Sequence, residues 1–109
     1  MRTFLVRALP LAALVSANAQ AAEGWGQSLT IISFIPTENG ITINVTDNSG
    51  NPMACAVPTW LLVNATDPNY ALISSTILTA FAQSKTVKVW QDSCRSDGSV
   101  HFRAAWIDR

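Results

Sequence analysis

The fold is decided by one stretch, DPNYALISSTILTAFAQSK, which runs from Asp67 to Lys85. Asp67 can cap free backbone N–H groups, and Pro68 suits the first helical position because no N–H donor is needed there. Lys85 places a cation near the negative end of the helix dipole. The stretch therefore predicts a helix over residues 67–85.

The predicted helix has two faces of different character. At about 100° per residue, one broad arc is apolar and includes Ile73, Ile77 and Ala80. A surface helix usually carries charges opposite such an arc, but no residue from 69 to 84 is charged. We therefore predict that the second face contacts other subunits; a small, slightly apolar helix is the alternative. The residues expected on this oligomer face are Leu72, Ser75, Thr76, Thr79 and Gln83.

Strand-like segments flank the helix on both sides. Residues 29–35, 41–46 and 59–63 precede it, and residues 86–91 and 100–107 follow it, all rich in β-branched or aromatic side chains. The order β-β-β-α-β-β predicts a mainly β protein with one helix. A five-stranded barrel of the oligonucleotide/oligosaccharide-binding (OB) type has this order, and its closure removes the sheet edges. A two-layer α+β sandwich is the alternative.

Residues 1–22 have the pattern of a signal peptide. A basic start is followed by an apolar run over residues 8–15 and then by small residues with two Ala-x-Ala sites. The apolar run is too short to span a bilayer, so no membrane insertion is expected. We predict cleavage within Ala19–Ala22 and a secreted or periplasmic protein. Residues 23–109 would then form one OB-fold-like domain.

Charge excludes two classes of partner. Residues 1–22 hold two of the seven basic residues and none of the seven acidic ones, so the remainder has a net charge of −2. A binder of nucleic acid or of an anionic membrane would need a basic patch. We predict neither partner.

The chain has two cysteines, Cys55 and Cys94. An exported protein meets an oxidising compartment, so we predict a structural disulfide between them. A metal site or a reactive thiol is the alternative. Two cysteines with the single histidine, His101, make a poor zinc set, and we expect no metal and no cofactor.

Catalytic residues are not indicated. His101 lies on the expected last strand, opposite its apolar face, which is typical of a solvated or rim residue. No serine lies in a Gly-x-Ser-x-Gly elbow. Asp92 and Asp97 fall in an expected turn, where carboxylates usually make local hydrogen bonds. We predict that the protein is not an enzyme; a small hydrolase is the disfavoured alternative.

Several motifs carry a family resemblance. The MACAV segment at 53–57, Trp60, the helix, the AQSKTVKV segment at 82–89 and the Trp25-Gly26 pair resemble the receptor-binding B subunits of AB5 toxins. The similarity is to the subtilase-cytotoxin and pertussis-like branch, including stand-alone bacterial proteins similar to its B subunit. The resemblance implies an OB-fold protomer in a ring of five, whose helices line a central pore. It also implies glycan binding on the barrel side and leaves the presence of an A subunit open.

The first functional hypothesis is a non-catalytic glycan-binding module. Aromatic side chains would stack on sugar rings, and short polar side chains would supply hydrogen bonds. Within the resemblance, Ser28 is the counterpart of the family's sialic-acid-contacting Ser. The second hypothesis is an exported protein-interaction or inhibitor module. The candidate glycan-binding residues are Trp25, Gln27, Ser28, Trp60 and Asn64.

Overall fold

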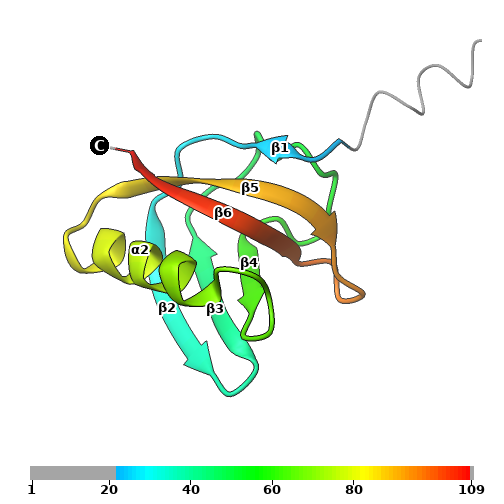
Figure 1. Cartoon of the computed structure of the whole chain (residues 1–109). Coiled ribbons are helices and arrows are strands. Elements are labelled where there is room, and N and C mark those ends of the chain that lie inside the picture. The colour runs from blue at the N-terminus through cyan, green and yellow to red at the C-terminus, as the bar shows by residue number, and fades with distance from the viewer. Residues whose placement is uncertain (1–21, 109) are drawn as a thin grey trace, which may run out of the picture.

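The computed structural model describes residues 22–108 (Figure 1). The expected signal peptide, residues 1–22, lies outside these residues apart from Ala22. Six strands and one helix follow one another within residues 22–108. They are β1 (Gly24–Trp25), β2 (Ile31–Thr37), β3 (Gly40–Val45), β4 (Trp60–Asn64), α2 (Tyr70–Ala82), β5 (Thr86–Cys94) and β6 (Val100–Asp108).

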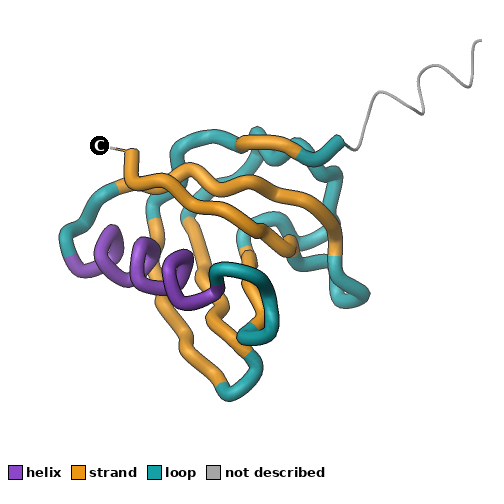
Figure 2. The backbone as a smooth tube through the Cα atoms, in the orientation of Figure 1, coloured by secondary structure: helices purple, strands orange, loops and turns teal. Residues whose placement is uncertain are grey.

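The strands form one six-stranded sheet in the order β1-β5-β6-β4-β3-β2. Neighbouring strands are antiparallel except for β4 and β6, which pair in parallel at Leu61↔Val100 and Leu62↔His101. β1, β5 and β6 run side by side across one part of the molecule, and β2, β3 and β4 form the other (Figures 1 and 2). The prediction of a mainly β protein with one helix between the third and fourth main strands is confirmed.

The expected closed barrel of five strands is not what the structure shows, because the sheet is unclosed and has a sixth strand. The sixth strand, β1, comes from residues before the expected first strand and pairs with β5, whereas the expected first strand corresponds to β2 and pairs with β3. Between them, the Gln27 side chain donates to the Asp47 carboxylate and accepts the Gly50 N–H. One isolated bridge, Leu29↔Val87, joins the segment before β2 to β5.

The core is formed by alternate residues of the strands and one face of the helix. In β3, Ile41, Ile43 and Val45 are buried while the residues between them are not, as the alternating sequence predicts. α2 contributes buried Ile73, Ile77 and Ala80, and contacts β2, β4, β5 and β6. The helix therefore joins the two parts of the sheet through a shared apolar core.

The helix begins later than predicted. It starts at Tyr70 rather than Asp67, and Asn69 precedes it in a left-handed conformation with φ of 62° and no side-chain cap. Asp67 does not cap the helix because its carboxylate Oδ2 accepts the backbone N–H of Asn64 at 2.8 Å and lies 2.6 Å from His101 Nε2. The Asp-Pro start signal was wrong because a more distant partner competes for the carboxylate.

The second face of α2 is exposed in the protomer. On this face Leu72 is 69% exposed, whereas Ile73 and Ile77 on the opposite face are buried; Leu78, at the edge of the apolar arc, is 48% exposed. The hydroxyl of Ser75 donates to the carbonyl of Leu72 at 3.1 Å, and that of Thr76 donates to the same carbonyl at 2.8 Å. These hydroxyls are satisfied within the helix, which leaves an uncharged outer surface.

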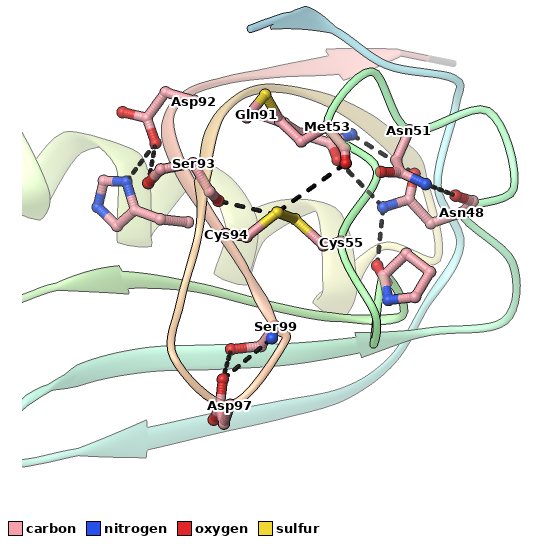
Figure 3. Close-up of a disulfide and its surroundings, with 12 residues drawn as sticks. Asn48, Asn51, Met53, Cys55, Gln91, Asp92, Ser93, Cys94, Asp97 and Ser99 are labelled. Carbon is pink, nitrogen blue, oxygen red and sulfur yellow. Dashed lines mark hydrogen bonds and ion pairs between the residues drawn. A yellow bond between two sulfur atoms is a disulfide. The ribbon is translucent and has the colours of Figure 1, made fainter. Parts of the chain in front are cut away.

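The predicted disulfide between Cys55 and Cys94 is present (Figure 3). It fastens the end of β5 to the long connection between β3 and β4. A buried amide pair holds the same connection, because Asn48 Nδ2 donates to Gln91 Oε1 at 3.2 Å and to the Pro58 carbonyl at 2.7 Å. The connection is thereby fixed at two points although it contains no strand of its own.

Candidate binding groove

A groove of about 260 Å³ lies on the surface of β3 and β4. We call it the Trp60 groove. The β2–β3 turn, including Asn39, borders it on one side, and the β5–β6 loop, with Arg95 and Asp97, borders it on another. Its volume is close to the lower end of ligand pockets, about 300–1,000 Å³. The groove therefore suits a small ring or one unit of a longer chain.

Gly40 shapes one wall of this groove. It begins β3 with a φ of +144°, and a Cβ built there would lie 2.1 Å from the carbonyl oxygen of Val63. The Thr37 hydroxyl donates to the Gly40 carbonyl at 3.1 Å and accepts the Asn39 N–H at 3.2 Å. The absence of a side chain at Gly40 thus allows β3 to approach β4 closely at the groove.

The β5–β6 loop is held in place by the segment that precedes β4. The carbonyl of Gly98 accepts the Val57 N–H at 2.8 Å, and Cys94 is bonded to Cys55. Within the loop, the carbonyl of Ser99 accepts the Arg95 N–H at 2.8 Å. Arg95 and Asp97 are therefore presented to the groove by a loop with fixed ends.

The groove contains both charged and neutral hydrogen-bonding groups. Arg95 Nη1 donates to Asn64 Oδ1 at 3.4 Å. The Ser99 hydroxyl donates to Asp97 Oδ1 at 2.6 Å, and this bond, with the Ser99 N–H bond, lowers the pKa of Asp97 below 3.8. Asp97 is therefore an ionised acceptor beside a guanidinium donor.

Trp60 supplies the aromatic surface. Trp60 is 37% exposed at the start of β4, where its backbone N–H donates to the Val57 carbonyl at 3.3 Å. A tryptophan face next to fixed donors and acceptors is the combination that holds an amphipathic ring, because one side of such a ligand is apolar and its rim is polar.

The structure brings together two of the five candidate ligand residues. Trp60 and Asn64 line the groove. Gln27 donates to Asp47 and accepts the Gly50 N–H, while the Ser28 hydroxyl donates to the Asp108 carboxylate. The polar groups of these two residues are thus bonded within the protein.

Trp25 lies in a separate cluster, which we call the tryptophan patch and define as Trp25, Trp90 and Trp106. Trp25 contacts the other two edge to face, with ring centroids 5.7 and 5.5 Å apart. Lys88 Nζ lies 5.5 Å from the Trp106 centroid, and Arg103 Cζ lies 5.6 Å from that of Trp90. Trp25 and Trp106 are 42% and 50% exposed, so the patch is a second aromatic surface.

His101 is not the solvated residue that its strand position predicts. Its Nδ1 lies 2.6 Å from Asp92 Oδ1 and its Nε2 lies 2.6 Å from Asp67 Oδ2, and only 15% of the side chain is exposed. Asp92 is part of β5 rather than of a turn. We call these three residues the His101 clamp; a pocket of about 390 Å³ lies beside it.

The sequence did not reveal the groove's charged residues or the His101 clamp. Arg95 and Asp97 had a usable signal, because a polar loop between two strands often borders a ligand site. The clamp had none, because His101 and Asp67 are 34 residues apart and meet only through the parallel pairing of β4 with β6.

Comparisons with protein-family models, with curated proteins and with solved structures find no match for this chain. Among residues 22–108, no group of three or more His, Cys, Asp or Glu side chains is arranged to hold a metal ion. In the same part of the chain, no helix has the length and apolar character needed to cross a membrane.

Proposed function

We propose that this protein is an exported, non-catalytic module that binds glycans in the Trp60 groove. The observation that carries the proposal is the half-exposed Trp60 ring beside Asn64, Arg95 and Asp97 in a groove of about 260 Å³. Sugars offer apolar C–H faces and a rim of hydroxyls, and this arrangement provides a partner for each.

The strand arrangement supports the proposal through a likeness to the OB fold. The order β2-β3-β4-β6-β5, the parallel β4–β6 pair and the helix between β4 and β5 resemble those of a five-stranded Greek-key barrel, although the sheet is unclosed; the isolated bridge Leu29↔Val87 joins the segment before β2 to β5, where such a barrel would close. OB folds bind oligonucleotides and oligosaccharides on their second and third strands, between the adjoining loops. The Trp60 groove occupies the equivalent position here.

Charge favours sugars over nucleic acids at this position. With residues 1–22 removed the chain carries a net charge of −2, and Asp97 lies beside the single groove cation, Arg95, among the described lining residues. A nucleic-acid site would need several cations along the backbone path. The non-catalytic part of the proposal rests on His101, whose two ring nitrogens both face carboxylates and so are not free to act as a base.

A glycan array followed by titration tests the proposal. A glycan that binds the oxidised protein should lose at least about tenfold in affinity with Trp60→Ala, which corresponds to about 1.4 kcal/mol. The matched control is Trp106→Ala, which removes an exposed tryptophan outside the groove. Binding that survives Trp60→Ala and disappears with Trp106→Ala would contradict the assignment of the groove.

We propose also that copies of the chain assemble through the second face of α2, in a ring of five. Leu72 is 69% exposed, and no charged residue lies on α2. Among the residues of this uncharged face, Leu72 is the apolar side chain, and covering it with another copy removes apolar surface from water. Ser75→Glu or Thr79→Glu would bring like charges together at the proposed interface and should lower the native mass measured by light scattering. Thr46→Glu, at an exposed position away from α2, is the control and should leave the mass unchanged. An unchanged mass in both helix variants would refute this interface.

The second candidate function is binding of another protein, and the tryptophan patch favours it. Trp and Arg are enriched at the energetic centres of protein interfaces, and here Trp25, Trp90 and Trp106 lie together with Arg103. If no glycan binds, Trp106→Ala becomes the variant that should weaken capture of a protein partner.

A further inference from the structure

The geometry of the His101 clamp requires two donated protons from one ring. Each 2.6 Å contact joins a ring nitrogen to a carboxylate oxygen, and a carboxylate can only accept. A neutral imidazole carries one N–H and would leave the other nitrogen's lone pair facing an oxygen. The charged ring satisfies both contacts, so the clamp is complete only when His101 holds two protons.

The surrounding charges favour that state. Asp67 reaches the ring from the β4–α2 turn and Asp92 from β5, while Arg103, on the same strand as His101, borders the adjacent pocket. β4 and α2 contribute no charged side chain. Burial opposes the charge on the ring, but hydrogen bonds and the charges of Asp67 and Asp92 outweigh it, and the pKa of His101 is raised above 6.5.

One arm of the clamp reaches the Trp60 groove. The Asp67 Oδ2 atom that faces His101 also accepts the backbone N–H of Asn64 at 2.8 Å. Asn64 lines the groove and accepts a hydrogen bond from Arg95. A change at the His101–Asp67 contact is therefore one hydrogen bond away from a residue of the groove.

We propose that the His101 clamp is a proton-operated switch that fixes the β4–α2 turn to β5 and β6 and thereby sets the position of Asn64. Loss of one proton breaks one of the two contacts. When the contact to Asp67 breaks, the turn loses its attachment to β6, and the Asp67 carboxylate that accepts the Asn64 N–H can shift. The consequence for glycan affinity, a change as pH crosses the switch point, rests on the function proposed above; the switch itself does not.

An NMR titration of the oxidised protein tests the switch without any ligand. His101 is the single histidine, so its ring signals are unambiguous. Between about pH 5 and pH 9 we expect the ring to titrate with a midpoint above the ordinary value of about 6.5, and the Asn64 amide signal to follow the same midpoint. A ring midpoint at or below that value, or an Asn64 amide that does not follow it, would overturn the proposal.

Variants separate the switch from general effects on the fold. Asp67→Asn should lower the His101 midpoint by about one unit or more because an opposite charge is lost. Asp92→Asn should lower it as well while keeping the Asp67–Asn64 hydrogen bond, so it serves if Asp67→Asn folds poorly. His101→Gln should abolish the pH response of the Asn64 amide. The matched control is Asp47→Asn, which removes a carboxylate bonded to Gln27 and Ser49 and should leave the His101 midpoint unchanged.

Discussion

Removing the Cys55–Cys94 bridge should cost a large share of the protein's stability. The two cysteines are 39 residues apart. For a loop of that length, the chain-entropy relation gives an entropy change of about 13 cal/mol/K, or about 3.9 kcal/mol at 25 °C. A domain of this size has a total free energy of unfolding of about 4–13 kcal/mol. We therefore expect the Cys55→Ala/Cys94→Ala variant to unfold at much lower denaturant.

Urea unfolding followed by tryptophan fluorescence measures the effect. Wild type in reductant is the matched control, because it keeps both sulfur atoms and loses only the cross-link; its loss should be similar to that of the double variant. Cys55 is buried, so any excess loss in the double variant measures packing of its sulfur. A loss below about 1 kcal/mol in both would refute the chain-entropy reasoning.

Three further outcomes follow from particular residues. Because the pKa of His101 is raised above 6.5 in the folded protein, the protonated ring contributes its full stabilisation at pH values below 6.5, and this contribution is lost as pH rises through the folded-state pKa. Over that rise the melting temperature of the wild type should fall, and that of His101→Gln should not. Burial tends to raise the pKa of Asp67, but its hydrogen bonds to His101 and Asn64 outweigh burial and lower that pKa below 3.8. The stability of the wild type should therefore fall as pH drops through the lowered pKa, and the fall should be smaller in Asp67→Asn. Gly40→Ala should destabilise the protein by about 1–3 kcal/mol in urea unfolding, because φ is +144° and the new Cβ meets the Val63 carbonyl, whereas Gly24→Ala, with nothing within 4 Å, should change little; equal effects would contradict this reading of the turn.

The parts of the fold that depend on local sequence were predicted well. Alternation in β3 placed Ile41 and Ile43 in the core, and helical periodicity placed Ile73 and Ile77 there. The disulfide followed from the number of cysteines and the expected export. These features rest on patterns that repeat within a few residues or on compartment chemistry, so no knowledge of the tertiary structure was needed.

The errors arose where a distant residue competes for a local group. Asp67 reads as a helix cap, but His101 and the Asn64 N–H occupy its carboxylate. Residues 23–27, before the expected first strand, suggest a short flexible lead, but pairing of Trp25 with Trp90 makes Gly24–Trp25 the sheet's sixth strand. Likewise, the candidate ligand residues Trp25 and Trp60 share an aromatic character but lie in separate clusters. Which of these distant residues become neighbours depends on the order of the strands in the sheet, which local sequence patterns do not give.

The parallel pairing of β4 with β6 joins segments that are distant along the chain. Leu61 and Val100 must find each other across 39 residues, the same separation as the two cysteines. Pairings between distant segments slow folding because the loop between them must close, at a cost in chain entropy, before the stabilising contacts can form. Once the bridge forms, the path from Leu61 to Val100 shortens to about a dozen residues, which lowers the closure cost by about 1 kcal/mol. The bridge should therefore accelerate assembly of β6 on β4, and the reduced chain should refold several-fold more slowly than the chain with the bridge intact.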